Sequence, residues 1–261
     1  MEVIGVKVEK PIGIGENLAE ALIRALEDSG IEIRDGDIIA VTSKVVSYSQ
    51  GRLVRLSDVK PSAKAVEMAL KYDLTPEIAE LVIREADEIV GGVKRYILTI
   101  RNGVVLGNAG VDKSNAPYGM VVLPPANPEA VAHTLRHEIY EKVGVKTGVL
   151  IVDSRIEPLR RGTVGVALAV AGFEPLSDER GKPDIYGKPL LVTRRALADM
   201  LASAAELYFG ERDELTPFVL IRGAPIRRTD RWIHSSVMFI PREECIFFGS
   251  MKHEDDAEDN G

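Results

Sequence analysis

The sequence predicts a mixed α/β fold, and three observations lead to this prediction. Short apolar runs typical of strands alternate with segments whose apolar residues recur at helical spacing. Their order lacks the strict βαβα alternation of a doubly wound sheet. The chain has 261 residues, 45% hydrophobic and 28% charged. That is enough for one large domain or two coupled ones.

The N-terminal half predicts a strand, a helix, a second strand and two further helices. The first helix places Leu18, Leu22 and Leu26 on one face and closes at Gly30. The last helix has Pro76 in its first turn, where proline is tolerated. In order, these elements are expected over residues 3–8, 16–29, 38–47, 62–72 and 76–90.

The C-terminal half predicts a hairpin, two helices and three further strands. The hairpin is expected because Asn102 and Gly103 tolerate the positive φ of a tight turn. The helix after it begins with Asn127 as a cap and Pro128 as its first residue. The elements are the hairpin strands 96–100 and 104–106, the helix 127–143, the strands 149–152 and 163–171, the helix 193–209 and the strand 217–221.

Charge and composition exclude several classes of protein. The net charge of −7 argues against a nucleic-acid or anionic-membrane binder, and no apolar run is long enough to span a bilayer. A single cysteine, Cys245, rules out an internal disulfide. With no signal pattern at the N-terminus, we expect a cytoplasmic protein. Few Gln and Asn beside many charges favour a thermophilic origin, and the acidic residues 251–261 predict a disordered tail.

The stretch GNAGVDKSNAPYG, residues 107–119, is close to a phosphate-binding P-loop. It fails as one because Pro117 and Gly119 break the helix that must follow, and because Asp112 would repel a phosphate held against bare backbone. A divalent cation between them would reconcile carboxylate and phosphate, so Asp112 is a candidate metal ligand. The alternative interpretation is that Asp112 caps a turn.

Two further stretches carry candidate ligands. In VLIVDSRIEPLRRG, Asp153 and Ser154 come directly after an apolar strand and precede Arg160 and Arg161. A carboxylate at a strand end can hold a metal, and guanidinium groups match phosphate and carboxylate. The alternative is a turn with solvated arginines. In LYFGERDELTP, Glu211 follows a helix end, and base rates favour a solvated loop charge when this residue is taken alone.

Together these stretches resemble the archaeal coenzyme F420-0:L-glutamate ligase family. The motifs NAGVDKSN, LIVDS before RRG, DERGKPDIYGKPLLVT, Ala198-Asp199 and FGE before PFVLIRG occur in order, over about residues 6–223. The resemblance implies a ligase that uses GTP to phosphorylate the carboxylate of F420-0, whose acyl phosphate is then attacked by the amine of L-glutamate. It also implies a two-part α/β architecture forming an intertwined homodimer, with residues 1–250 as one domain.

The resemblance assigns roles to particular residues. Two divalent metals, Mg²⁺ or Mn²⁺, are expected at Asp112, Asp153, Ser154 and Glu211, with K⁺ as a further candidate cofactor. Asp153 and Arg160 are the candidate catalytic residues. The implied nucleotide contacts are Lys10, Pro11, Ile12, Gly13, Ser43, Lys44, Tyr48, Asn115, Phe209, Gly210, Arg212, Asp213, Glu214, Leu215 and Thr216.

The sequence departs from the family pattern at several positions. Tyr48 and Gln50 replace a lysine and a glutamate, which removes a cation aimed at phosphate. Glu157 replaces an arginine and so inverts a charge, and the remaining departures are Ile156, Leu159 and Met200. Two alternatives follow: a ligase of the same fold with another carboxylate acceptor, or a catalytically silent paralogue that binds nucleotide or metal.

Overall fold

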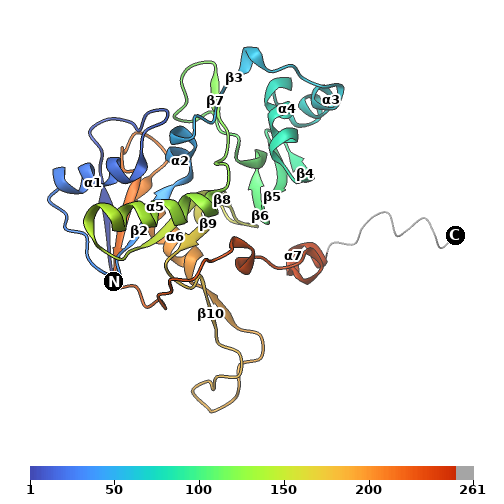
Figure 1. Ribbon diagram of the computed structural model, residues 1–261. Coiled ribbons are helices and arrows are strands. Elements are labelled where there is room, and N and C mark those ends of the chain that lie inside the picture. The colour runs from blue at the N-terminus through green and yellow to red at the C-terminus, as the bar shows by residue number, and fades with distance from the viewer. Residues whose placement is uncertain (251–261) are drawn as a thin grey trace.

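The computed structural model describes residues 1–250, so the predicted acidic tail lies outside the described residues. Its centre is a five-stranded sheet in the order β1-β12-β2-β8-β9 (Figure 1). β2 and β8 run parallel, and the other neighbouring strands run antiparallel. The five strands are β1 (Glu2–Val6), β12 (Phe218–Arg222), β2 (Ile38–Thr42), β8 (Gly148–Ile156) and β9 (Thr163–Ala171).

Helices cover both faces of this sheet because its strands are apolar on both sides. Ile39 and Ile151 point into the core under α1 (Leu18–Asp28) and α5 (Pro128–Val143). Their neighbours in sequence, Ile38 and Leu150, point into a second core under α6 (Leu197–Phe209). Since side chains alternate across a strand, each apolar run supplies both cores.

A smaller part of the chain has its own core. α3 (Ala63–Tyr72) and α4 (Pro76–Glu85) pack with β5 (Tyr96–Arg101) of a three-stranded sheet. That sheet also contains β4 (Glu88–Val93) and β6 (Val104–Gly107). The short strands β3 (Leu53–Arg55) and β7 (Met120–Val122) pair beside it. This mixed architecture of a main sheet and a smaller part agrees with the predicted fold class.

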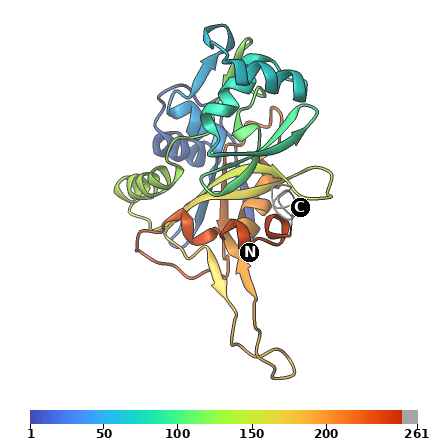
Figure 2. The same ribbon diagram turned by 90° about the vertical axis from the view of Figure 1, so that its right-hand side faces the viewer.

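A long hairpin projects away from the main sheet (Figures 1 and 2). Its base is the pair β10 (Leu176–Asp178) and β11 (Arg194–Ala196). The residues between them, 179–193, are folded back by turns in which the Asp184 carboxylate accepts hydrogen bonds from the Tyr186 and Lys188 amides. We refer to residues 176–196 as the finger. Within residues 1–250, none of the helices has the length and apolar character needed to cross a membrane.

Several predicted elements are confirmed with corrected boundaries. The strand expected over 38–47 ends at Thr42, whose hydroxyl accepts from the Val45 amide and starts α2 (Ser43–Ser49). The helix expected over 76–90 ends at Glu85, because the next residues pair as β4. The helix expected over 193–209 begins at Leu197, because residues 194–196 pair with β10.

The strand expected over 149–152 continues to Ile156, since β9 pairs with it along its whole length. Asp153 and Ser154 therefore lie inside β8 and not after it, which corrects the predicted placement. The predicted hairpin turn is confirmed: Asn102 and Gly103 have φ of 47° and 74° between β5 and β6. The Asn127 cap and the Gly144 end of α5 are also as their residue types favour.

Candidate active site

A cavity of about 610 Å³ opens where the main sheet meets the smaller part. Its floor comes from the ends of β2 and β8, one wall from the loop after β6, and the opposite wall from the end of α6 and the loop that follows. The predicted site residues that line it are Pro11, Ile12, Ser43, Lys44, Tyr48, Asp112, Asn115, Asp153, Ser154, Phe209, Gly210, Glu211, Arg212, Asp213, Glu214, Leu215 and Thr216. The structure thus brings together residues that are widely separated in sequence.

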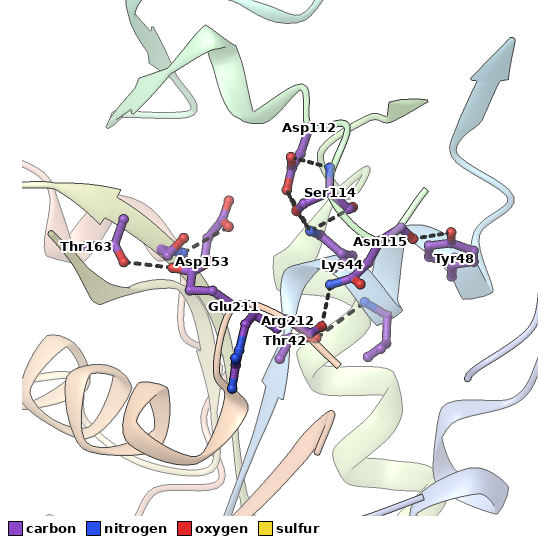
Figure 3. Close-up of polar contacts among 12 residues, drawn as sticks. Thr42, Lys44, Tyr48, Asp112, Ser114, Asn115, Asp153, Thr163, Glu211 and Arg212 are labelled. Carbon is purple, nitrogen blue, oxygen red and sulfur yellow. Dashed lines mark hydrogen bonds and ion pairs between the residues drawn. The ribbon is translucent and has the colours of Figure 1, made fainter. Parts of the chain in front are cut away.

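Lys44, in the first turn of α2, joins two sides of the cavity. Its ammonium donates to Oδ2 of Asp112 at 2.6 Å and to the hydroxyl of Ser114 at 2.5 Å (Figure 3). The side chain reaches this point because Thr42 ends β2 and α2 begins immediately beneath the loop after β6. A cation is therefore fixed at the edge of the cavity by acceptors from the smaller part of the chain.

Asp112 is held by both its backbone and its carboxylate. It pairs with Val122 through two backbone hydrogen bonds of 3.0 and 2.8 Å, and its Oδ1 accepts from the Ser114 amide at 2.8 Å. Although desolvation opposes it, hydrogen bonds from Lys44 and Ser114 hold the pKa of Asp112 below its ordinary value. Asp112 thus organises the turn, as the alternative interpretation expected, while its role as a metal ligand stays a prediction.

The loop after Asp112 is closed over the cavity by two hydrogen bonds. The Tyr48 hydroxyl donates to the carbonyl of Asn115 at 2.6 Å, and the Asn115 amide donates to the carbonyl of Arg212 at 2.8 Å. Desolvation raises the pKa of Tyr48, so its phenol stays protonated and able to donate. Tyr48 thus links α2 to this loop without a charge.

Acidic side chains gather on the opposite side, facing the Lys44–Asp112 pair (Figure 3). Asp153 accepts from the Ser154 amide at 3.0 Å, and desolvation raises its pKa despite a hydrogen bond from Ser43. Glu211 accepts from the Thr163 hydroxyl at 2.7 Å, which ties the loop after α6 to β9. Like charges that share a desolvated site favour protonation or a bound cation.

Glu206 is a further acid of the cavity, and the sequence analysis missed it. Desolvation and repulsion by Glu211 and Asp153 raise its pKa to about 7. A signal was present: Ala202, Ala205 and Phe209 mark the inward face of α6, and Glu206 lies on the same side. An acid on that face is aimed at the interior and not at solvent.

Three predicted residues do not line the cavity. Lys10 lies in a smaller neighbouring cavity of about 270 Å³ that also contains Arg24, and the Gly13 amide donates to Glu16 at 2.8 Å. Arg160 lies in the exposed turn between β8 and β9, where its backbone amide donates to the Glu157 carbonyl at 3.2 Å. The structure does not bring Arg160 to the other candidate catalytic residue, Asp153.

The donors around the cavity have the chemistry of a divalent-metal site. Carboxylate and hydroxyl oxygens are the ligands that Mg²⁺ and Mn²⁺ prefer, and Asp112, Asp153, Ser154 and Glu211 all supply them. Across residues 1–250, however, no group of three or more His, Cys, Asp or Glu side chains converges closely enough to hold a metal. The residues fit a divalent metal in donor type, while Asp112 and Glu211 are at present hydrogen-bonded to Lys44 and Thr163.

Comparison with known proteins decides the family. The model of the F420-0:Gamma-glutamyl ligase family matches residues 6–223. The chain belongs to this family. It is therefore a ligase that forms C–N bonds, which is the enzyme class that its motifs predicted. The matched range contains every residue described above as lining the cavity.

Similar members of the F420-0:Gamma-glutamyl ligase family cover most of the chain. A protein of Methanopyrus kandleri named coenzyme F420:L-glutamate ligase is 42% identical over 84% of this chain and 85% of its own length. Proteins of the same name from Methanocaldococcus jannaschii and Methanothermobacter thermautotrophicus are 39% and 37% identical, over 87% and 95% of this chain. The latter match spans 99% of that relative, and because it covers 95% of this chain it extends beyond residue 223.

Proposed function

We propose that this protein is a GTP- and divalent-metal-dependent ligase that joins L-glutamate to the carboxylate of coenzyme F420-0. The names of its relatives support the substrates. One structural observation carries the proposal: a single cavity holds the fixed cation of Lys44 opposite the carboxylates of Asp153, Glu206 and Glu211. Phosphoryl transfer needs this combination of cations for the phosphates and acids for metal binding.

Two divalent metals, Mg²⁺ or Mn²⁺, would be held by Asp112, Asp153, Ser154 and Glu211, with K⁺ as a further candidate cofactor. When bound, they would neutralise the phosphate oxygens and orient the γ-phosphoryl group. Thr163 and Ser43, which donate to Glu211 and Asp153, orient these carboxylates.

In the first step an oxygen of the F420-0 carboxylate attacks the γ-phosphorus, the bond to the bridging oxygen breaks, and GDP leaves. In the second step the glutamate amine attacks the carbonyl carbon of the acyl phosphate, the C–N bond forms, the C–O bond to the phosphate breaks, and the phosphate leaves with the proton that the amine gives up. Lys44 would offset phosphate charge in both steps. The Asn115–Arg212 hydrogen bond holds two loops over the cavity and would exclude water, which otherwise hydrolyses an acyl phosphate.

The reaction of purified protein with F420-0, L-glutamate, GTP and Mg²⁺ or Mn²⁺, analysed by mass spectrometry, tests this function. We expect a gain of glutamyl units, and we expect Asp153→Asn to abolish it while the melting temperature is retained. Asp58→Asn, an exposed acid of the smaller part, is the matched control. If no glutamyl product forms while a relative is active in the same buffer, a different carboxylate acceptor or a silent paralogue replaces the proposal.

We also propose that the chain forms a homodimer through the finger. Its tip exposes Ile185 by 91%, Tyr186 by 80% and Leu191 by 79%, although these are large apolar side chains. An ordered, projecting apolar surface of this kind is typical of an interface. Analytical ultracentrifugation is expected to show a dimer that becomes a monomer with Ile185→Asp and Leu191→Asp; a wild-type monomer contradicts the proposal.

A further inference from the structure

Residues 224–250 follow the last strand of the main sheet and lie beyond the range matched by the family model. We call them the strap. The strap leaves β12, passes below α5 in the view of Figure 1, where it contacts the first turns of that helix, and ends in α7 (Ile246–Gly249). Its contacts fall into two separate groups, one on each part of the protein.

The first group anchors the strap to α5 in the main part. Glu129 accepts three hydrogen bonds from the strap: from Nε1 of Trp232 at 2.7 Å, from Nδ1 of His234 at 3.0 Å and from the Ser235 amide at 2.7 Å. The Trp232 ring stacks on His133, one turn further along α5, with ring centroids 3.7 Å apart. Ile233, which lies between Trp232 and His234 in the sequence, is buried in the core beneath α6. This end of the strap is therefore firmly attached.

The second group anchors the strap to the three-stranded sheet of the smaller part. Phe239 covers the β5–β6 turn so closely that a Cβ added at Gly103 would lie 2.4 Å from its ring. Three residues later, the Arg242 guanidinium pairs with the Glu88 carboxylate of β4. The smaller part also meets the main core directly through Val104 and Leu106 of β6. The strap holds the outer side of the same sheet.

The two anchors matter because the cavity lies between the same two parts. Asp112 and Asn115 follow β6 in the chain, whereas Asp153 and Glu211 belong to the main part. A shift of β6 would move Asp112 relative to Asp153. Displacements of about 1 Å are enough to lower a rate by about 100-fold in a site that depends on alignment.

We propose that the strap is a positioning element of the active site: by holding β4–β6 against the main sheet, it sets the distance between the Asp112 wall and the Asp153 wall at which the nucleotide binds. Phe239 and the Arg242–Glu88 pair are its positioning residues. This inference rests on the proposed function for its nucleotide, but the geometry that it predicts is measurable without turnover.

Charge reversal at the second anchor tests it. Arg242→Glu places two carboxylates together, and Glu88→Arg places two guanidinium groups together. The double variant restores a pair of opposite charges. We expect each single variant to raise the KM for GTP about three- to tenfold with a smaller change in kcat, and the double variant to recover the wild-type KM. Phe239→Ala is expected to act in the same direction. Arg34→Glu, which removes an exposed pair with Glu32 of the main part, is the matched control.

Hydrogen exchange followed by mass spectrometry separates this inference from the proposed function. Arg242→Glu should accelerate exchange in residues 104–112, and the double variant should restore protection, whether or not the protein turns over. An inactive wild-type protein with this exchange pattern would reject the ligase assignment alone. Unchanged exchange and unchanged KM in the single variants, or a double variant that recovers neither, would overturn the positioning role.

Discussion

The ammonium of Lys44 lies 2.6 Å from Oδ2 of Asp112 and joins α2 of the main part to the loop that follows β6. This pair places a positive charge at the point where the sequence predicted a metal ligand. A divalent cation at Asp112 must therefore share the carboxylate with Lys44 or displace it. The same ammonium also keeps the pKa of Asp112 low, so that the carboxylate is ionised and available.

Replacing Lys44 tests whether its ammonium is needed for activity and whether it competes with a metal for Asp112. Under the proposed function, Lys44→Met is expected to lower kcat/KM for GTP by at least about 100-fold, because the cation proposed to offset the phosphate charge is lost. Mn²⁺ affinity, measured by electron paramagnetic resonance, should rise because Asp112 loses its competing partner. Lys44→Arg keeps the charge, so its kcat/KM and its Mn²⁺ affinity are expected to lie between those of the wild type and the methionine variant. Weaker Mn²⁺ binding by the methionine variant would show that Lys44 supports the metal and does not compete with it.

Glu206 gives a pH-dependent prediction for the metal-free protein. Its pKa of about 7 lies above the ordinary value of 4.5, so the folded state favours the protonated carboxyl. The contribution of protonated Glu206 to the stability of the folded protein is fully present below pH 4.5. It is lost as the pH rises through about 7. In chelator, Glu206→Gln should therefore be more stable than wild type at pH 8, by about 1–2 kcal/mol. The two denaturation midpoints should converge at pH 5; a constant offset would contradict the raised pKa.

Gly165 of β9 permits the close approach of α6. A Cβ added there would lie 2.3 Å from the Ala202 carbonyl oxygen, which is backbone and cannot rotate away. Gly165→Ala is expected to cost about 1–3 kcal/mol of stability and to displace Glu206 and Glu211 by pushing α6 outward. Gly91→Ala is the matched control, because nothing lies within 4 Å of its added Cβ. Thermal melts of both variants test this, and equal melting temperatures would contradict it.

His133 makes the anchor of the strap sensitive to pH. Desolvation lowers the pKa of His133 below its ordinary value of 6.5, and its Nε2 accepts from the Ile233 amide at 3.3 Å. A hydrogen bond of the ring with the Ile233 backbone and the charge of Glu129 oppose this shift, whereas Arg136 and His234 add to it. The contribution of neutral His133 is present above pH 6.5 and is lost as the pH falls through its lowered pKa.

His133→Phe keeps a ring against Trp232 but carries no titrating group. The melting temperature of the wild type should fall relative to that of the variant between pH 7 and pH 5, the range that contains the ordinary pKa of 6.5. Because Glu129 and His234 are present in both proteins, the difference between the two pH profiles isolates the contribution of His133. Parallel pH profiles of the two proteins would show that His133 does not titrate against the strap.

Local sequence chemistry predicted much of the fold. The Asn102–Gly103 turn and the Asn127 cap were identifiable because their residue types favour one backbone geometry. The strand 38–47 was predicted too long, because β-branched residues of α2 continue the apolar run and only the Thr42 cap ends it. The pairing of β10 with β11 was missed, since an exposed hairpin carries little hydrophobic alternation.

Site residues that belong to sequence motifs could be predicted, whereas partners brought close only by the tertiary fold could not. Asp112, Asp153 and Glu211 were identified from three separate motifs, and they share one cavity. Their partners were not identifiable: Lys44 reaches Asp112 across 68 positions in sequence, and Thr163 reaches Glu211 across 48. The roles of Lys10, Gly13 and Arg160, a cytoplasmic location and a thermophilic origin stay predictions.

The place of β12 in the main sheet has a consequence for how the protein is made. Residues 218–222 lie between β1, at the very start of the chain, and β2. While the chain is being synthesised on a ribosome, β1 and one edge of β2 therefore remain unpaired until β12 has emerged. A nascent chain arrested before residue 218 would expose apolar strand edges and bind chaperones, whereas one arrested after the strap could close the sheet. Assembly of the sheet beneath the candidate active site therefore follows the synthesis of β12.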